Sequence, residues 1–109
     1  MVGDIGGTNA RFALVVPGES DLISIKALSC GEFETVQDAI KAYLSSISKV
    51  EISSSCIASA GTTHLDIFKP ANNDWVINKV DVSSALNDVK VSWINDFSAQ
   101  ALATSTLSN

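Results

Sequence analysis

Two short segments of the chain carry side chains suited to phosphate chemistry. In the first, Asp4 precedes the pair Gly6-Gly7, and Thr8 and Asn9 follow it. Adjacent glycines let the backbone turn sharply and leave N–H groups uncovered, so phosphate oxygens can approach closely, while Thr8 and Asn9 add side-chain donors. Asp4 suits a hydrated Mg²⁺, because magnesium prefers carboxylate ligands and retains several waters. An ordinary hairpin turn, in which Asp4 and Asn9 bond to the local backbone, is an equally good interpretation of these residues.

This glycine turn differs from the two best-known phosphate loops. No Gly-x-x-x-x-Gly-Lys-Ser/Thr sequence follows Asp4. A dinucleotide-binding glycine motif opens a helix, whereas the apolar residues after this turn favour a strand. The segment is therefore predicted to be a strand, a turn and a second strand.

The second segment is the pair Asn95-Asp96, which follows an apolar stretch. Transfer of a phosphoryl group to a hydroxyl needs a carboxylate that accepts the proton and groups that fix the acceptor molecule. Asp96 suits the first role and Asn95 the second. The residues alone favour a plainer interpretation, in which the pair caps a helix and places an acid in its first turn. The two roles are compatible, because a capping side chain points to the strand ends where a substrate would lie.

Few other residues favour a reactive role. His64 is the only histidine, and no Cys or paired acid stands at ligand spacing from it. It is therefore predicted to be a loop residue rather than a metal ligand or a base. Cys30 and Cys56 are isolated and are predicted to be buried, reduced thiols. Trp75 and Trp93 are expected in the core.

Length and composition limit the protein to one globular domain. The chain has 109 residues, 46% hydrophobic and 17% charged, with a formal net charge of −5. Its hydrophobicity argues against disorder, and its scattered cations argue against a nucleic-acid or anionic-membrane partner. No apolar run approaches the roughly 20 residues that span a bilayer, and the N-terminus lacks the pattern of an export signal. The composition predicts a cytoplasmic domain.

The first part of the chain must position the glycine turn. Apolar residues predict strands over 2–5, 11–16 and 22–28. Tight turns at 6–9 and 17–21 join them, since both are rich in residues that favour turns. Three strands joined in this way form an antiparallel meander.

The rest of the chain alternates between helical and extended patterns. Thr35 and Asn78 suit helix N-caps, and each is followed three residues later by an aspartate, Asp38 and Asp81. The predicted elements are, in order, a helix over 36–47, strands over 53–60 and 65–68, a helix over 79–86, a strand over 89–94 and a helix over 96–107.

These elements predict an α/β fold. Five main strands form a mixed sheet in the order β-β-β-α-β-α-β-α, with helices packed over it. Ligands of such sheets bind at the carboxyl ends of the parallel strands. The glycine turn and Asn95-Asp96 both follow such ends, so the pattern places them together.

Four segments resemble bacterial glucokinases, which belong to the actin/hexokinase/Hsp70-like ATPase superfamily. The stretch from Asp4 to Leu14 is similar to the first phosphate motif of that family, and Ile94-Asn95-Asp96-Phe97-Ser98-Ala99 to its sugar-binding segment. Cys56-Ile57-Ala58-Ser59-Ala60-Gly61 resembles the fourth strand, and Asn72 with Trp75 matches an Asn-x-x-Trp pattern. The resemblance runs along the whole chain in the right order.

The resemblance implies a fold, a reaction and a set of roles. The fold is a ribonuclease H-like (actin-like ATPase) domain, and the reaction transfers a phosphoryl group from ATP to the 6-hydroxyl of glucose, the first step of glycolysis. Asp96 is the implied base, and Asn95 and Asn72 bind the sugar. The implied ATP phosphate site is Asp4, Gly6, Gly7, Thr8 and Asn9, with Mg²⁺ held by Asp4 through water.

Full-length relatives are about three times as long and close two domains over a cleft. Residues 1–109 are thus expected to be the small N-terminal domain, inactive without the missing C-terminal domain, and a homodimer is a further hypothesis. Relatives often have Pro where Thr62-Thr63 follows Gly61, so this loop is expected to differ. Two alternatives stay open: a sugar sensor that binds glucose without phosphorylating it, and a structural actin-like ATPase module.

Overall fold

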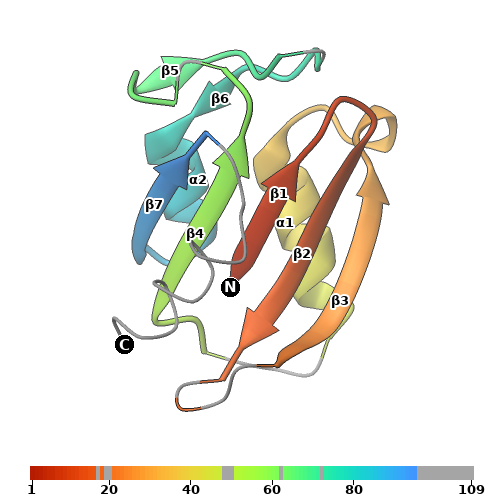
Figure 1. The fold of residues 1–109 in the computed structure, drawn as a ribbon, viewed down its shortest axis with the longest axis vertical. Coiled ribbons are helices and arrows are strands. Elements are labelled where there is room, and N and C mark those ends of the chain that lie inside the picture. Colours follow the sequence, from red (N-terminus) through yellow and green to blue (C-terminus); the bar gives the residue numbers. More distant parts are fainter. Residues whose placement is uncertain (17, 19–20, 48–50, 62, 72, 96–109) are drawn as a thin grey trace.

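The protein folds around one mixed five-stranded sheet with the strand order β3-β2-β1-β4-β7 (Figure 1). The computed structural model describes residues 1–16, 18, 21–47, 51–61, 63–71 and 73–95. The five strands are β1 (Val2–Ile5), β2 (Asn9–Val15), β3 (Leu22–Ser29), β4 (Ser54–Ser59) and β7 (Lys90–Ile94). All five main strands predicted from the sequence are confirmed, with bounds that differ by at most two residues.

The direction of each strand follows from the connection before it. Short connections join β1 to β2 and β2 to β3, and both pairs are antiparallel, which confirms the meander. Longer connections containing helices lead to β4 and β7, and the pairs β1–β4 and β4–β7 are parallel. Parallel neighbours need such crossovers, because the chain must return to the same end of the sheet.

Two helices cover one face of the sheet, behind the strands in Figure 1. The helix α1 (Val36–Ser45) begins after Thr35, whose hydroxyl accepts the N–H of Asp38 at 3.2 Å. The helix α2 (Lys79–Ala85) begins after Asn78, whose side-chain oxygen accepts the N–H of Val80 at 3.0 Å. Both predicted N-caps are confirmed. A short 3₁₀ helix, η1 (Cys30–Glu32), follows β3. Within the described ranges, neither helix is long and apolar enough to cross a membrane.

The predicted order lacks one strand. The strand expected over 65–68 is shortened to β5 (Ile67–Phe68), and it pairs with an unpredicted strand, β6 (Ile77–Asn78), in a separate two-stranded sheet. Strands of two residues are too short to produce a hydrophobic period, so the pattern could not reveal this hairpin. The helix expected over 96–107 lies outside the described residues.

The main core fills the space between the sheet and the helices. Phe12, Ile57 and Tyr43 are at most 1% exposed, and the rings of Phe12 and Tyr43 have centroids 5.4 Å apart. A smaller cluster of Val2, Ala13 and Cys56 lies on the opposite face of the sheet.

The predictions for the thiols and the tryptophans can be checked in this core. Cys30 and Cys56 are free and buried, as predicted. Trp75 is buried, as expected, whereas Trp93 is half-buried and meets Phe68 edge to face at 5.5 Å.

Candidate phosphate and sugar site

The two chemically suggestive segments meet at one edge of the sheet. The parallel strands β1, β4 and β7 end at the same edge, where the turn between β1 and β2 also lies (Figure 1). Asp4 pairs with Ala58, and Ala58 pairs with Ile94, so these three residues form one row across the strands. Adjacent strands lie about 4.8 Å apart, which puts the Cα atoms of Asp4 and Ile94 about 10 Å apart. Asn95 follows Ile94 directly and therefore lies at the same edge of the sheet as Asp4 and the turn.

The glycine turn is held by its backbone and exposes its donors. Residues 6–9 are all exposed, and the N–H of Gly6 donates to the carbonyl of Asn9 at 2.9 Å. The carbonyl of Thr8 accepts the N–H of Cys30 at 2.8 Å, which ties the turn to the end of β3. Among the described residues, the N–H groups of Gly7 and Thr8 have no acceptor. Two backbone donors are thus available to an anion at the sheet edge.

Asp4 is accessible to a ligand or a hydrated cation. It is exposed on the sheet face opposite α1 and lines a cavity of about 200 Å³, whose other charged residue is Arg11. Arg11 is the cross-strand neighbour of Asp4, but the two side chains form no ion pair. Neither Asp4 nor Asn9 uses its side chain to bond another described residue. The hairpin exists, but the local side-chain bonds of the plainer interpretation are not found in the described chain.

Asn95 is oriented by a residue that the sequence did not single out for a role. Its Oδ1 accepts the hydroxyl of Thr63, which is 7% exposed. The carbonyl of Thr63 in turn accepts the ammonium of Lys79 on α2. Among the described residues no group accepts from the Nδ2 of Asn95, so this exposed residue can donate its amide N–H groups to a substrate oxygen. Thr63 lies in the loop that the sequence analysis expected to differ from that of relatives. Nothing in the sequence indicated that Thr63 contacts Asn95.

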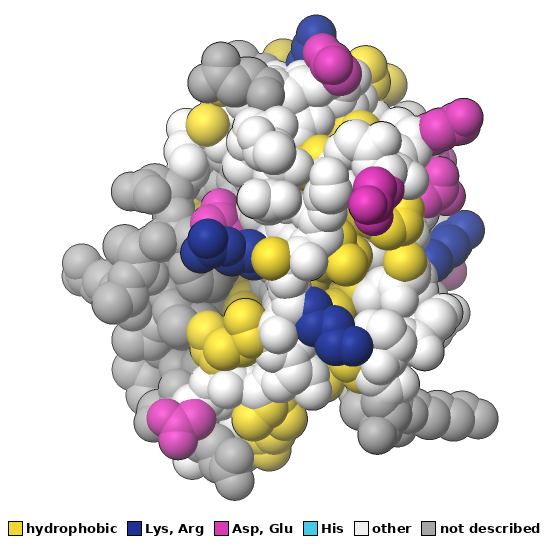
Figure 2. Space-filling view, turned by 90° about the vertical axis from the view of Figure 1, so that its right-hand side faces the viewer, with side chains coloured by type: hydrophobic (Ala, Val, Ile, Leu, Met, Phe, Trp, Pro, Cys, Tyr) yellow, Lys and Arg dark blue, Asp and Glu magenta, His cyan; other side chains and the backbone are white. Residues whose placement is uncertain are grey.

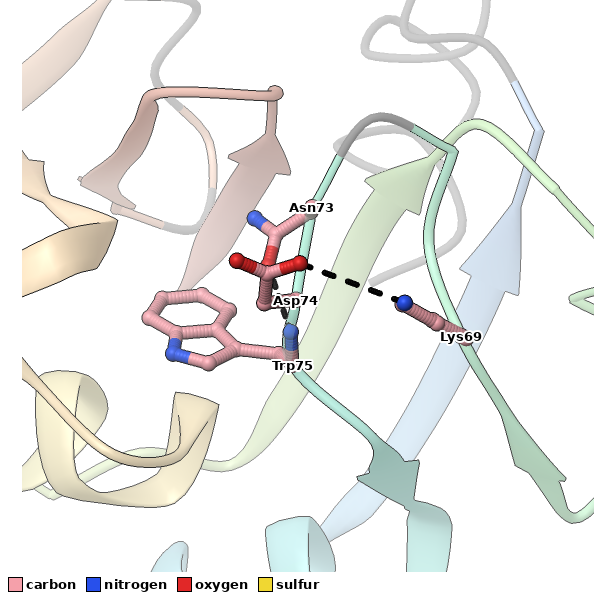
Figure 3. A network of polar contacts seen from close by, with 4 residues as sticks. All are labelled: Lys69, Asn73, Asp74 and Trp75. Carbon is pink, nitrogen blue, oxygen red and sulfur yellow. Dashed lines mark hydrogen bonds and ion pairs between the residues drawn. The ribbon is translucent and has the colours of Figure 1, made fainter.

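A second residue missed by the sequence analysis is Asn73. It is 6% exposed, and its Nδ2 donates to the carbonyl of Gly6 at 2.9 Å. Its Oδ1 accepts the N–H of Trp75 at 2.8 Å, the bond drawn in Figure 3. The segment between β5 and β6 is thereby joined to the glycine turn. The only indication in the sequence was the neighbouring Asn-x-x-Trp pattern, which pointed to Asn72.

Two predicted site residues, Asp96 and Asn72, lie outside the described residues. Their roles therefore stay predictions. His64 is exposed in a turn, as predicted, and lines a separate cavity of about 620 Å³ together with Lys79 and Trp93.

The cationic side chains are scattered on one face of the molecule. On the face shown in Figure 2, the Lys and Arg side chains stand apart from one another instead of forming a patch. No group of three or more metal-ligating side chains occurs within the described ranges. A hydrated Mg²⁺ that also binds phosphate needs only one or two protein carboxylates, and Asp4 offers one.

Comparison with known proteins agrees with this arrangement. A profile of the family described as Glucokinase matches residues 1–109. A glucokinase of Hahella chejuensis is 40% identical over 104 residues, covering 95% of this chain and 32% of the relative. A glucokinase of Chromohalobacter salexigens is 43% identical over 102 residues, covering 94% of this chain and 32% of the relative.

Comparison of structures leads to the same family. The crystal structure of a glucokinase from an Antarctic psychrotroph superposes with a TM-score of 0.77 at 29% identity, covering 88% of this chain and 31% of that one. The chain thus spans about a third of the length of the relatives that it matches, at 32% of each. The match over its whole length shows that the chain belongs to the glucokinase family.

Proposed function

We propose that this chain forms the N-terminal domain of an ATP-dependent glucokinase, which transfers a phosphoryl group from ATP to the 6-hydroxyl of glucose. The observation that carries the proposal is the row from Asp4 through Ala58 to Ile94. The row ends near the glycine turn, which offers backbone donors, and near the side-chain amide of Asn95. Because the chain belongs to the glucokinase family, this arrangement supports a site for phosphate and sugar. The relatives' length supports a second domain that completes the cleft.

Each predicted residue has a role in this proposal. The turn of Gly6, Gly7, Thr8 and Asn9 receives the ATP phosphates through backbone and side-chain donors. Asp4 would hold Mg²⁺ through water, and that ion would supply positive charge to the ATP phosphates.

The sugar side of the site completes the assignment. Asn95 donates its free amide N–H groups to sugar oxygens, Asn72 shapes the same side, and Asp96 accepts the proton of the attacking hydroxyl.

The proposal extends to fold class and location. We assign the sheet to the ribonuclease H-like (actin-like ATPase) class, supported by the meander and the two parallel crossovers. We place the protein in the cytoplasm, which fits two buried free cysteines. A homodimer stays a prediction that analytical ultracentrifugation tests.

The first experiment is an amide NMR titration of the 109-residue chain with glucose and then with Mg·ATP. We expect Mg·ATP to shift Gly7 and Thr8, and glucose to shift Asn95. Asp4→Asn should weaken Mg·ATP binding by about tenfold, because a charged magnesium-binding group is lost. The matched control is Asp21→Asn, which removes an exposed carboxylate near the opposite ends of β2 and β3. If Asp4→Asn binds Mg·ATP with the same affinity as Asp21→Asn and the unsubstituted chain, Asp4 is not part of the site.

A second experiment tests the reaction. The chain is joined to the remaining two thirds of the Hahella chejuensis relative, and glucose phosphorylation is measured with and without Asp96→Asn. We expect the substitution to abolish turnover while glucose affinity changes no more than a few-fold, because a base acts in the transition state. Normal turnover would show that Asp96 is not the base. Glucose binding without turnover in the unsubstituted fusion would favour the sugar-sensor alternative.

A further inference from the structure

The buried amide of Asn73 is the most completely bonded side chain near the proposed phosphate site. Its Oδ1 accepts the N–H of Trp75 at 2.8 Å, and its Nδ2 donates to the carbonyl of Gly6 at 2.9 Å. A backbone N–H can only donate and a carbonyl can only accept, so these two partners fix which way the amide faces. Nδ2 also lies 3.3 Å from the Sγ of Cys30.

Trp75, at the other end of this connection, is buried and hydrogen-bonded. Trp75 is 4% exposed, and its indole N–H donates to the carbonyl of Phe33 at 3.0 Å. Trp75 therefore fixes the backbone N–H that orients Asn73. The buried Trp75 thus fixes the position of Asn73. Asn73 in turn contacts Gly6, which lies 67 positions earlier in the chain.

The contact with Gly6 determines which groups of the turn remain for a ligand. The N–H of Gly6 donates to Asn9 and its carbonyl accepts from Asn73, so both backbone groups of Gly6 are used. The carbonyl of Thr8 is likewise bound, by the N–H of Cys30. These two carbonyls are thus bonded within the protein and are not free to face an incoming anion, whereas the N–H groups of Gly7 and Thr8 have no acceptor among the described residues.

We propose that Asn73 is a positioning residue that holds the Gly6 carbonyl inward and so keeps the glycine turn in its phosphate-binding conformation. This inference rests on the proposed function, because it needs the turn to bind phosphate. Asn73 itself touches the turn from the buried side and makes no contact with the ligand.

The experiment compares two isosteric changes at adjacent positions of this chain. Both are made in its fusion to the remaining two thirds of the Hahella chejuensis relative, because the proposed function needs a second domain to complete the cleft. Asn73→Asp replaces the donor to Gly6 by a carboxylate oxygen, which repels that carbonyl. The control Asp74→Asn makes the converse change at an exposed residue whose partner is Lys69, 4.0 Å away (Figure 3). Affinity for Mg·ATP and the amide shifts of Gly7 and Thr8 are followed by NMR.

We expect Asn73→Asp to weaken Mg·ATP binding by about tenfold and to shift Gly7 and Thr8, because a buried hydrogen bond is replaced by repulsion. Asp74→Asn should bind as the unsubstituted fusion does. If Asn73→Asp does not fold, Asn73→Ala is judged by the same criterion, since it removes the donor without adding charge.

Two results would overturn the inference, and they differ. If the Asn73 variants bind Mg·ATP normally and only the signals around Trp75 move, Asn73 stabilises its own loop and does not position the turn. If the unsubstituted fusion, which contains both domains, binds no Mg·ATP, the proposed function of the turn is wrong and the inference is lost with it.

Discussion

Gly3 in the central strand of the sheet is a single residue whose size is limited by the side chains packed against it. Gly3 lies in β1, and a Cβ built there would approach two ring carbons of Phe12 at 3.0 Å and Ile57 at 3.6 Å. Phe12 is 1% exposed and packs on Tyr43, so its ring cannot move aside. The absence of a side chain at position 3 thus allows the ring of Phe12 to cover β1, directly before Asp4.

Gly3→Ala should lower the free energy of unfolding by about 1–3 kcal/mol, the usual cost of overpacking a tight core. The measurement is urea unfolding followed by tryptophan fluorescence. Gly31→Ala is the matched control, because its nearest contact would be the Ser29 hydroxyl at 4.0 Å and the site is exposed. A loss at Gly31 as large as that at Gly3 would contradict the packing argument.

At the scale of the elements, both α-helices start where a side chain replaces a missing hydrogen-bond partner. Thr35 and Asn78 accept first-turn N–H groups that have no carbonyl within the helix. The end of α2 is marked differently, by Asn87 and Asp88 with φ of 59° and 62°. Asn and Asp tolerate this left-handed region better than most residues, so the chain can turn there toward β7.

Thr35→Ala should destabilise the protein by about 1 kcal/mol, because the N–H of Asp38 loses its acceptor. Thr35→Ser keeps the hydroxyl and should retain most of the stability. The urea midpoints of the two variants, compared where their m-values agree, show whether the hydroxyl of Thr35 provides the stability. Equal destabilisation by Ser and Ala would show that the methyl group of Thr35, not the cap, is responsible.

At the scale of the whole molecule, Tyr43 joins α1 to the edge of the sheet. Its side chain is fully buried, and its hydroxyl donates to the carbonyl of Ser24 on β3 at 2.9 Å. Ser24 has a φ of 54°, and the register of β2 and β3 shifts between Phe12 and Leu14. The helix thus supports an irregular part of β3 through one hydrogen bond.

Burial raises the pKa of Tyr43 above its ordinary value of 10.0. The folded state therefore keeps the phenol proton longer than the unfolded state does. This stabilisation is complete below pH 10 and is lost as the pH rises through the folded-state pKa. Tyr43 is the only tyrosine, so tyrosinate absorbance reports on it alone.

Tyr43→Phe should lower stability near neutral pH by about 1 kcal/mol, because the Ser24 carbonyl loses its donor. Above pH 10 the variant should lose stability less steeply than the parent, since one titrating group has been removed. Urea unfolding at neutral and alkaline pH measures both effects. Parallel pH profiles would show that ionisation of Tyr43 does not contribute.

The sequence predicted the elements well where the pattern was long or the cap was specific. The bounds of β1 at residues 2–5 and both helix N-caps agree with the structure. These features depend on residues near one another in the chain, so the local sequence contains the physical cause. The hairpin of β5 and β6 was not predicted, because its four residues are held by partners rather than by their own pattern.

The candidate site divides in the same way. The sequence by itself determined the glycine turn, the position of Asp4 and the proximity of both to Asn95, because alternating strands and helices bring parallel strand ends together. Only the tertiary structure decided that Thr63 orients Asn95 and that Asn73 holds Gly6. These contacts join residues 32 and 67 positions apart. Hydrogen bonds over such separations depend on how the elements pack, and no local pattern of residue types specifies that packing.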